Sequence, residues 1–105
     1  MMRAIWNGVI VAESAQTELL LGNHYFPPGT VNAQYLRRSA AQKNCPWIGT
    51  ADFLHLEVGG ERVENACWFY PSPRPEAREI RNYVAFGEAV EIQMTETAAF
   101  SMAGN

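Results

Sequence analysis

Residues 50–70 decide the fold, and they read TADFLHLEVGGERVENACWFY. Gly59-Gly60 stands in the middle of this stretch and supplies the positive φ angles that a tight two-residue turn requires. The residues on both sides of the turn alternate, near it, between apolar and polar types, which is typical of paired strands. The stretch therefore predicts a β-hairpin with strands at Thr50–Val58 and Glu61–Tyr70.

A two-residue turn also sets the register of this hairpin. It places Leu56 opposite Val63 and His55 opposite Glu64, whereas a three-residue loop would set Leu56 against a charged residue. The imidazole of His55 and the carboxylate of Glu64 would then form a pair on the solvated part of the hairpin.

Alternation along the two strands sorts their side chains onto two faces. One face is expected to hold Asp52, Leu54, Leu56, Val63, Asn65, Cys67 and Phe69. The other is expected to hold Ala51, Phe53, His55, Glu57, Arg62, Glu64, Ala66, Trp68 and Tyr70. Away from the turn both faces are apolar, so we expect that end of the hairpin to be covered on both sides.

Two further hairpins precede this one. Asn7-Gly8 is a strong type I′ turn signal and would pair Ile5 with Ile10, while Gly22-Asn23 would close a second turn. The corresponding strands are expected at Arg3–Trp6, Val9–Ala12, Thr17–Leu21 and His24–Phe26.

The remaining segments predict less regular structure. We expect a short helix over Val31–Arg38 capped by Thr30, and a loop over residues 39–49. Pro75 would begin a second short helix over Glu76–Arg81. Residues 84–94 predict a strand that is interrupted at Gly87, and residues 95–105 a tail that frays or lies at a dimer interface.

These expectations add up to a mainly β fold. Antiparallel hairpins would form bent sheets or a small open barrel, with one or two short helices, in a single domain over residues 1–94. The chain has 105 residues, 48% of them hydrophobic, which is globular composition.

Charge and cysteine content narrow the classes of function. The net charge is −3 and Lys43 is the only lysine, so Arg37-Arg38 with Lys43 is too small a basic cluster to predict nucleic-acid binding. No apolar run approaches the ~20 residues of a membrane span.

The compartment follows from the first residues and the cysteines. We expect no signal peptide, because the first residues already indicate a strand. Two cysteines without a signal peptide indicate reduced thiols in the cytoplasm.

Candidate chemistry centres on two stretches, CPWIGT at residues 45–50 and NACWFYP at residues 65–71. Cys45 is the best nucleophile candidate, with His24 as the imidazole that could activate it. The alternative is a half-buried cysteine that packs as a small apolar group. Asp52 shares a face with leucines, so it must either find hydrogen-bond donors among the neighbouring loop amides or line a site as a base or ligand contact.

The aromatic residues suggest either core or pocket. Tyr25, Trp47, Trp68 and Tyr70 lie at strand ends beside loops, where pockets form, and Asn65 would stand at the rim. Such a pocket would suit an unknown small polar or cationic-aromatic ligand. No metal or cofactor is predicted, because the two cysteines and two histidines lack the spacing of a metal site.

Five signatures carry a family resemblance: GVIVAES at 8–14, HYFP at 24–27, CPWIGT at 45–50, NACWFYPSP at 65–73 and IRNYVAF at 80–86. In their order and spacing the chain resembles the small bacterial domain-of-unknown-function family 427. The family signature usually has lysine where Ile48 stands and commonly alanine where Cys67 stands.

The resemblance implies a compact β domain with bent sheets, akin to the β-tent group, that pairs as a dimer. The family also carries a label suggesting nucleotidyltransferases. Such transferases need a Gly-Ser phosphate turn and clustered carboxylates, and this chain has Asp52 as its single aspartate.

Three functions remain open from the sequence. The first is a module that binds a small molecule among the aromatic residues. The second is an enzyme that uses Cys45 or Asp52 with His24, and the third is a homodimeric assembly protein whose interface includes the tail with Phe100.

Overall fold

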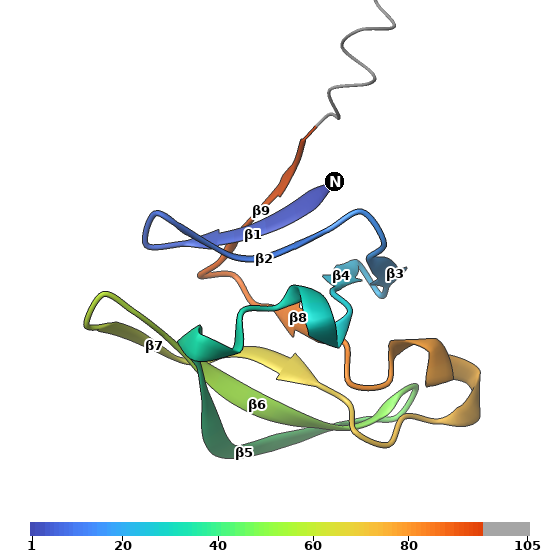
Figure 1. Cartoon of the computed structure of the whole chain (residues 1–105). Helices are drawn as coiled ribbons and strands as arrows, with labels where there is room; N and C mark the ends of the chain where they lie inside the picture. Colours follow the sequence, from blue (N-terminus) through green and yellow to red (C-terminus); the bar gives the residue numbers. More distant parts are fainter. Residues whose placement is uncertain (96–105) are drawn as a thin grey trace, which may run out of the picture.

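The computed structural model describes residues 1–95, and these residues form three antiparallel sheets (Figure 1). The three-stranded sheet has the order β2-β1-β9, with β1 at Met2–Trp6, β2 at Val9–Ser14 and β9 at Glu91–Met94. A small hairpin joins β3, Glu18–Leu20, to β4, Asn23–Tyr25. The four-stranded sheet runs β5-β6-β7-β8, with strands at Leu36–Cys45, Gly49–Val58, Glu61–Phe69 and Val84–Phe86.

The mainly β prediction is confirmed. The sheets do not close into a barrel, and the short helices are single 3-10 turns: η1 at Pro28–Thr30, η2 at Ala33–Tyr35 and η3 at Pro75–Ile80. No helix within residues 1–95 has the length and apolar character to cross a membrane. The prediction for the tail, including Phe100, concerns residues 96–105 and lies outside the described residues.

Turn chemistry explains two of the three hairpins. Asn7 and Gly8 have φ of 50° and 75°, and Ile5 pairs with Ile10 as predicted. Gly59 and Gly60 have φ of 60° and 82° and close the third hairpin as predicted. Both pairs therefore adopt the left-handed conformation that a two-residue hairpin turn requires.

The turn of the second hairpin lies one residue earlier than predicted. Leu21 and Gly22 occupy it with φ of 50° and 83°, and Asn23 already pairs with Leu20. This register directs Tyr25 into the interior, where only 2% of it is exposed. Burial of that aromatic side chain outweighs the turn preference of asparagine.

The helix and loop predicted over residues 31–49 are wrong. Asn32, rather than Thr30, caps only the short turn η2, by accepting a hydrogen bond from the Gln34 amide. Residues 36–45 form β5, which pairs with β6 alone and is the outer strand of its sheet. An edge strand tolerates a polar, charged sequence, so β5 carries no strand-like apolar alternation.

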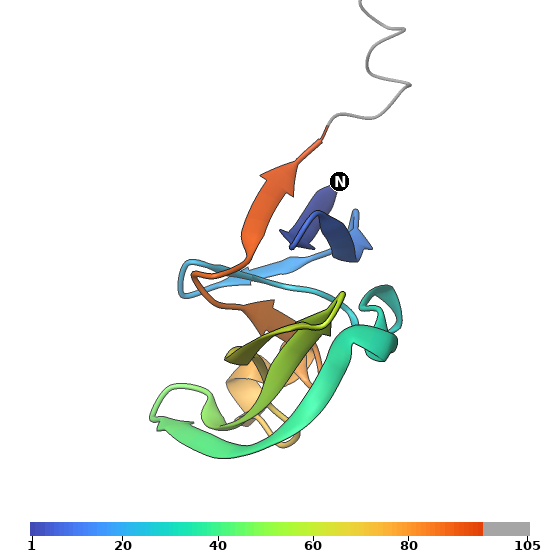
Figure 2. The same cartoon turned by 90° about the vertical axis from the view of Figure 1, so that its left-hand side faces the viewer.

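Two bulges bend the four-stranded sheet around β6. Three residues of β5, 39–41, lie opposite Phe53, and three residues of β7, 64–66, lie opposite His55. The backbone of Asn65 takes φ of 53° there, and its amide donates to His55 Nδ1 at 3.0 Å. The predicted pairing of His55 with Glu64 is therefore wrong, because the bulge replaces it with a contact to the backbone. Figure 2 shows how strongly β5 curves.

The register shift in β7 equals two residues, so it preserves the alternation of faces. Leu56 pairs with Val63 next to the turn, as predicted, whereas Leu54 pairs with Cys67 beyond the bulge. Most side chains therefore stay on the predicted faces, and Ala66, within the bulge, joins the core cluster of Leu56 and Cys67 instead of the opposite side.

The strand predicted over residues 84–94 is interrupted at Gly87, as expected, and its two halves enter different sheets. The Gly87 amide donates to the Ala66 carbonyl at 2.7 Å, and a Cβ at this position would lie 3.3 Å from the same oxygen. The close approach of two backbones therefore favours glycine here.

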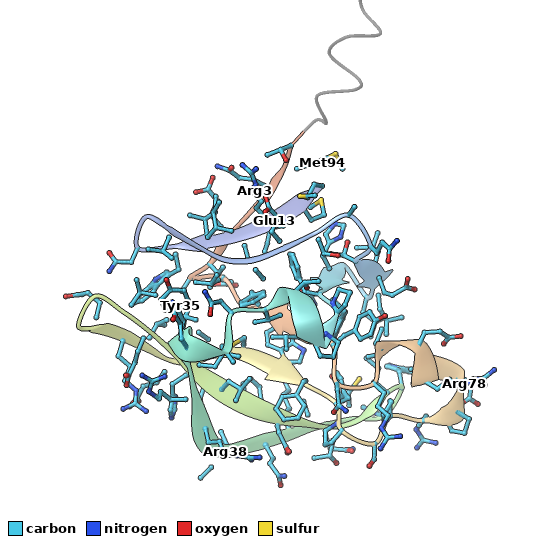
Figure 3. All side chains as sticks on the ribbon, in the orientation of Figure 1. Arg3, Glu13, Tyr35, Arg38, Arg78 and Met94 are labelled. Atoms are coloured by element: carbon cyan, nitrogen blue, oxygen red, sulfur yellow. The ribbon has the colours of Figure 1, made fainter. Side chains whose placement is uncertain are left out.

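A large apolar cluster, the closed core, fills the space between the three-stranded and four-stranded sheets. Phe26 and Cys67 are both 0% exposed in it, and the rings of Phe26 and Phe86 meet edge to face at 5.5 Å between centroids. Its buried members are Ala4, Val11, Ala12, Phe26, Leu56, Val58, Ala66, Cys67, Val84, Phe86 and Val90. On the outer side of this layer, Arg3 and Glu13 form a cross-strand ion pair (Figure 3).

Candidate functional site

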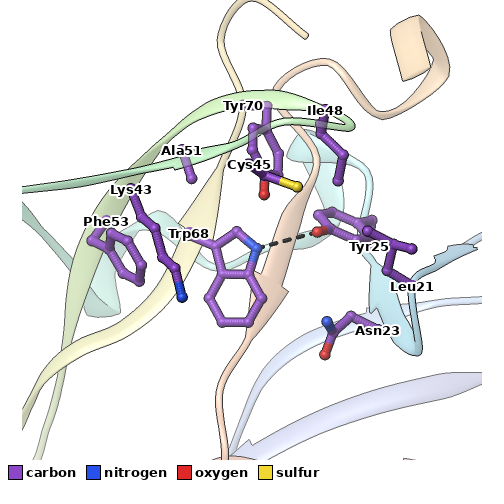
Figure 4. Close-up of a pocket in the computed structure, with 10 residues that line it drawn as sticks. All are labelled: Leu21, Asn23, Tyr25, Lys43, Cys45, Ile48, Ala51, Phe53, Trp68 and Tyr70. Carbon is purple, nitrogen blue, oxygen red and sulfur yellow. Dashed lines mark hydrogen bonds between the residues drawn. The ribbon is translucent and has the colours of Figure 1, made fainter. Parts of the chain in front are cut away.

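A cavity of about 350 Å³ opens on the other face of the four-stranded sheet, at the end away from the Gly59-Gly60 turn. We call it the Cys45 cavity (Figure 4). Its lining residues are Leu21, Asn23, Tyr25, Lys43, Cys45, Ile48, Ala51, Phe53, Trp68 and Tyr70.

Strand alternation explains most of this set. Four strands each contribute two residues that are two positions apart, as alternate side chains on one face must be. Three of these pairs lie within strands: Asn23 and Tyr25 in β4, Lys43 and Cys45 in β5, and Ala51 and Phe53 in β6. The fourth pair is Trp68, in β7, and Tyr70, the first residue after the end of β7. The residues between them point away from the cavity.

The wall is largely aromatic and aliphatic. Phe53 and Trp68 are direct cross-strand partners, and their ring centroids are 6.0 Å apart. Ile48 is 2% exposed and adds an aliphatic surface. An apolar wall of this kind gives a ligand area to bury, while the few polar groups determine its orientation.

Four polar side chains gather at the base of the cavity, and we call them the polar cluster: Tyr25, Cys45, Trp68 and Tyr70. Trp68 Nε1 donates to the hydroxyl oxygen of Tyr25 at 3.2 Å. Tyr70 and Cys45 line the cavity beside this bond. Figure 4 shows the sulfur and the two hydroxyl oxygens close to one another.

Burial dominates the acid–base behaviour of Tyr70. Only 6% of the residue is exposed, and this desolvation raises the pKa of its phenol well above the usual value. The neighbouring Tyr25 and Cys45 raise the pKa further, because their negative forms would repel a phenolate. Tyr70 therefore keeps its proton at any physiological pH.

The turn between β5 and β6 holds Cys45 at the cavity. The Ile48 amide donates to the Cys45 carbonyl at 3.1 Å, and the Arg74 amide donates to the Ile48 carbonyl at 2.6 Å. Gly49 has φ of 136°, and a Cβ there would lie 3.2 Å from the Ser72 carbonyl oxygen. The Cys-Pro-Trp-Ile-Gly sequence thus fixes a rigid corner against residues 72–74.

The structure brings four of the eight candidate residues together: Tyr25, Cys45, Trp68 and Tyr70 line one cavity. It places the other four elsewhere. His24 follows Asn23 on β4 and points the other way, with Nδ1 3.0 Å from the Thr17 hydroxyl. Trp47 is 75% exposed on the β5–β6 turn.

Asp52 and Asn65 also lie outside the cavity. Asp52 Oδ1 accepts a hydrogen bond from Gln42 Nε2 at 2.6 Å, so its partner is a side chain of β5 rather than the loop amides. Asn65 Oδ1 accepts from the Ser39 hydroxyl at 2.5 Å across the bulged region. Neither residue contacts Cys45 through these bonds.

Lys43, Asn23 and Leu21 are lining residues that the sequence did not single out. The sequence did not place Lys43 at the site, because residues 39–49 were expected to form a loop. Counting back two positions from Cys45 on a strand would have found it.

The described residues contain no group of three or more histidine, cysteine or acidic side chains that could hold a metal ion. The thiols of Cys45 and Cys67 are both free, and they belong to opposite faces of the sheet, one in the cavity and one in the closed core.

The comparison with known families agrees with the signatures that run along the chain. A model described as "Domain of unknown function (DUF427)" matches residues 1–97. The chain belongs to the DUF427 family. The match covers every strand of the structure, including all the residues of the cavity. No curated protein matches the chain.

Proposed function

We propose that this DUF427 protein binds a small organic molecule in the Cys45 cavity. The observation that carries the proposal is the cavity itself: about 350 Å³, open to solvent, with aromatic walls and with the polar ends of Tyr25, Tyr70 and Cys45 converging at its base. An apolar cavity with a few convergent polar groups is the usual form of a ligand site.

A thermal-shift screen with a library of small aromatic acids, amides and amines tests the proposal. A ligand at about 100 times its Kd adds about 2.7 kcal/mol to the free energy of unfolding, and so raises Tm by several degrees. The shift should vanish in Trp68→Ala, which removes part of the wall, and in Ala51→Leu, which fills the cavity.

Trp47→Ala is the matched control, because Trp47 is exposed on the adjacent turn and does not line the cavity. This variant should keep the full shift. Ligands that shift all three variants as they shift the unmodified protein would place binding elsewhere and contradict the proposal.

Catalysis by Cys45 with His24 or Asp52 has less support. Successive residues of a strand point to opposite faces, and His24 and Asp52 each stand next to cavity residues rather than among them. A binding module needs no such base.

One observation favours homodimeric assembly as a second candidate. Among residues 1–95, strand β9 is the outer strand of its sheet, and Ile92 and Met94 on it are 36% and 76% exposed. An unpaired edge with apolar side chains is a template for pairing with a second copy. Light scattering should give twice the 11.7 kDa of one chain, and Ile92→Lys should reduce that mass; a single-chain mass at all concentrations would contradict it.

A further inference from the structure

The wall of the Cys45 cavity carries a single formal charge, and it is positive. Lys43 is the only lysine of the chain and the only charged residue among the ten that line the cavity. None of the ion pairs among the described residues includes it. The protein as a whole has a net charge of −3. The positive charge of Lys43, beside an apolar surface, therefore has the opposite sign to the net charge.

The position of Lys43 is fixed by the sheet. It pairs with Ala51 in the β5–β6 register and lies two residues before Cys45 on the same face. Figure 4 shows its side chain extending between Phe53 and Trp68. The long aliphatic stem can lie along the aromatic surface while the ammonium remains available to a ligand.

The polar cluster adds donors near the indole nitrogen of Trp68. An indole N–H can only donate, so Tyr25 accepts from it and its own O–H remains able to donate. A phenol O–H and a thiol S–H can each donate one hydrogen bond, so Tyr70 and Cys45 add further donor groups at the cavity.

Every polar side chain of the cavity can therefore donate a hydrogen bond, and the one charged group is a cation. A ligand with acceptor oxygens and a negative charge would satisfy them, whereas a cationic ligand would meet Lys43 at close range. A volume of about 350 Å³ is near the lower end for organic-ligand sites, which fits a molecule of one or two rings.

We propose that the Cys45 cavity selects small aromatic acids, with the ring against Trp68 and Phe53 and the carboxylate toward the Lys43 ammonium. This inference rests on the proposed binding function and specifies the charge of its ligand. The expected ligand is therefore an anion, whereas the aromatic residues alone had suggested a small polar or cationic-aromatic ligand.

Three ligands of nearly the same shape test the selection: 2-naphthoate, its neutral amide 2-naphthamide, and the cation 2-naphthylmethylammonium. Their dissociation constants would be measured by calorimetry at pH 7.5 in low salt. The carboxylate should bind about fivefold more tightly than the amide, as expected for one partly exposed ion pair, and the cation more weakly than the amide. Added salt should reduce the difference.

Lys43→Gln should remove the preference for the carboxylate over the amide, while Lys43→Arg should keep it. Amide or cation binding as tight as the carboxylate, or a preference that survives Lys43→Gln, would overturn the selection and leave the binding function standing. Failure of all three ligands to bind would contradict both proposals.

Discussion

The closed core and the Cys45 cavity lie on opposite faces of one sheet, and the same strands build both. Along β6, Leu54 and Leu56 enter the closed core region while Ala51 and Phe53 line the cavity; in β7, Cys67 and Trp68 are neighbours in sequence and divide in the same way. The core face is sealed by the three-stranded sheet. Among residues 1–95, the small β3–β4 hairpin and η3 pack on the cavity face, and the cavity lies beside the hairpin.

The two cysteines show what this difference means chemically. Cys67 is 0% exposed, and its sulfur has only a weak contact with the Leu54 carbonyl at 3.8 Å, so burial raises the pKa of this thiol to about 12. Cys45 is half-buried and belongs to the polar cluster of the cavity. Cys67 therefore packs as an apolar residue of the closed core, whereas Cys45 is part of a polar surface that a ligand could reach.

The largest difference should be seen in thiol alkylation of the folded protein. At pH 8, a pKa of about 12 leaves about one Cys67 in ten thousand as thiolate, and the reagent must also wait for local unfolding. We therefore expect iodoacetamide to modify Cys45 at least about a thousandfold faster than Cys67. Peptide mass spectrometry over time would follow both sites.

Two variants sharpen this comparison. Cys67→Ala should keep the fast phase, and Cys45→Ser should abolish it. Equal modification rates at the two sites would mean that the core face is not sealed.

Core truncation should have the next largest effect. Phe26 is 0% exposed and packs against Phe86, so Phe26→Ala should lower the free energy of unfolding by about 3–5 kcal/mol. The midpoint of urea denaturation measures this change. Trp47→Ala removes an even larger side chain that is 75% exposed, and it should change stability by less than about 0.5 kcal/mol.

Alkaline pH should destabilise the closed core. Below about pH 9 the Cys67 thiol is protonated in both the folded and the unfolded chain; above it the unfolded chain loses the proton while the folded chain keeps it until about pH 12. Stability should therefore fall as pH rises from 9 to 12, by up to about 4 kcal/mol from this group.

The Cys67→Ala variant isolates that contribution, because Tyr70 also resists ionisation and contributes to the alkaline fall. Urea denaturation at several pH values should give a shallower decline for the variant than for the unmodified protein. Parallel declines would show that the buried thiol does not titrate as its burial requires.

Turn residues and alternation explain how much of this arrangement was predictable. Asn7-Gly8 and Gly59-Gly60 fixed two hairpins, because few residues adopt positive φ as readily. Alternation along the strand also separates Cys67 from Trp68 and Tyr70. Those inferences depend on local backbone chemistry, which the sequence encodes directly.

The errors arose where tertiary contacts override local preference. Residues 36–45 are polar and become a strand only because β6 offers an edge to pair with. The bulges at residues 39–41 and 64–66 have no signal in the alternation pattern either. Missing β5 also meant missing Lys43, the one charge of the cavity.

The site predicted from the sequence combined residues that cannot share one face of a strand. His24 and Tyr25 are adjacent on one strand, as Ala51 and Asp52 are on another, so each pair cannot share a face. The sequence identified the correct strand ends, but only the paired strands show which alternate residues face one another across the cavity.

The most direct measurement uses the indole N–H signals of Trp6, Trp47 and Trp68 in a ¹⁵N–¹H NMR spectrum, assigned with Trp68→Phe. The three residues report on the edge of the closed core, the exposed turn and the cavity. On titration with 2-naphthoate, the Trp68 signal should shift in a saturable way while those of Trp6 and Trp47 stay in place. A saturable shift of Trp6 or Trp47 with no change at Trp68 would contradict a binding site at the Cys45 cavity.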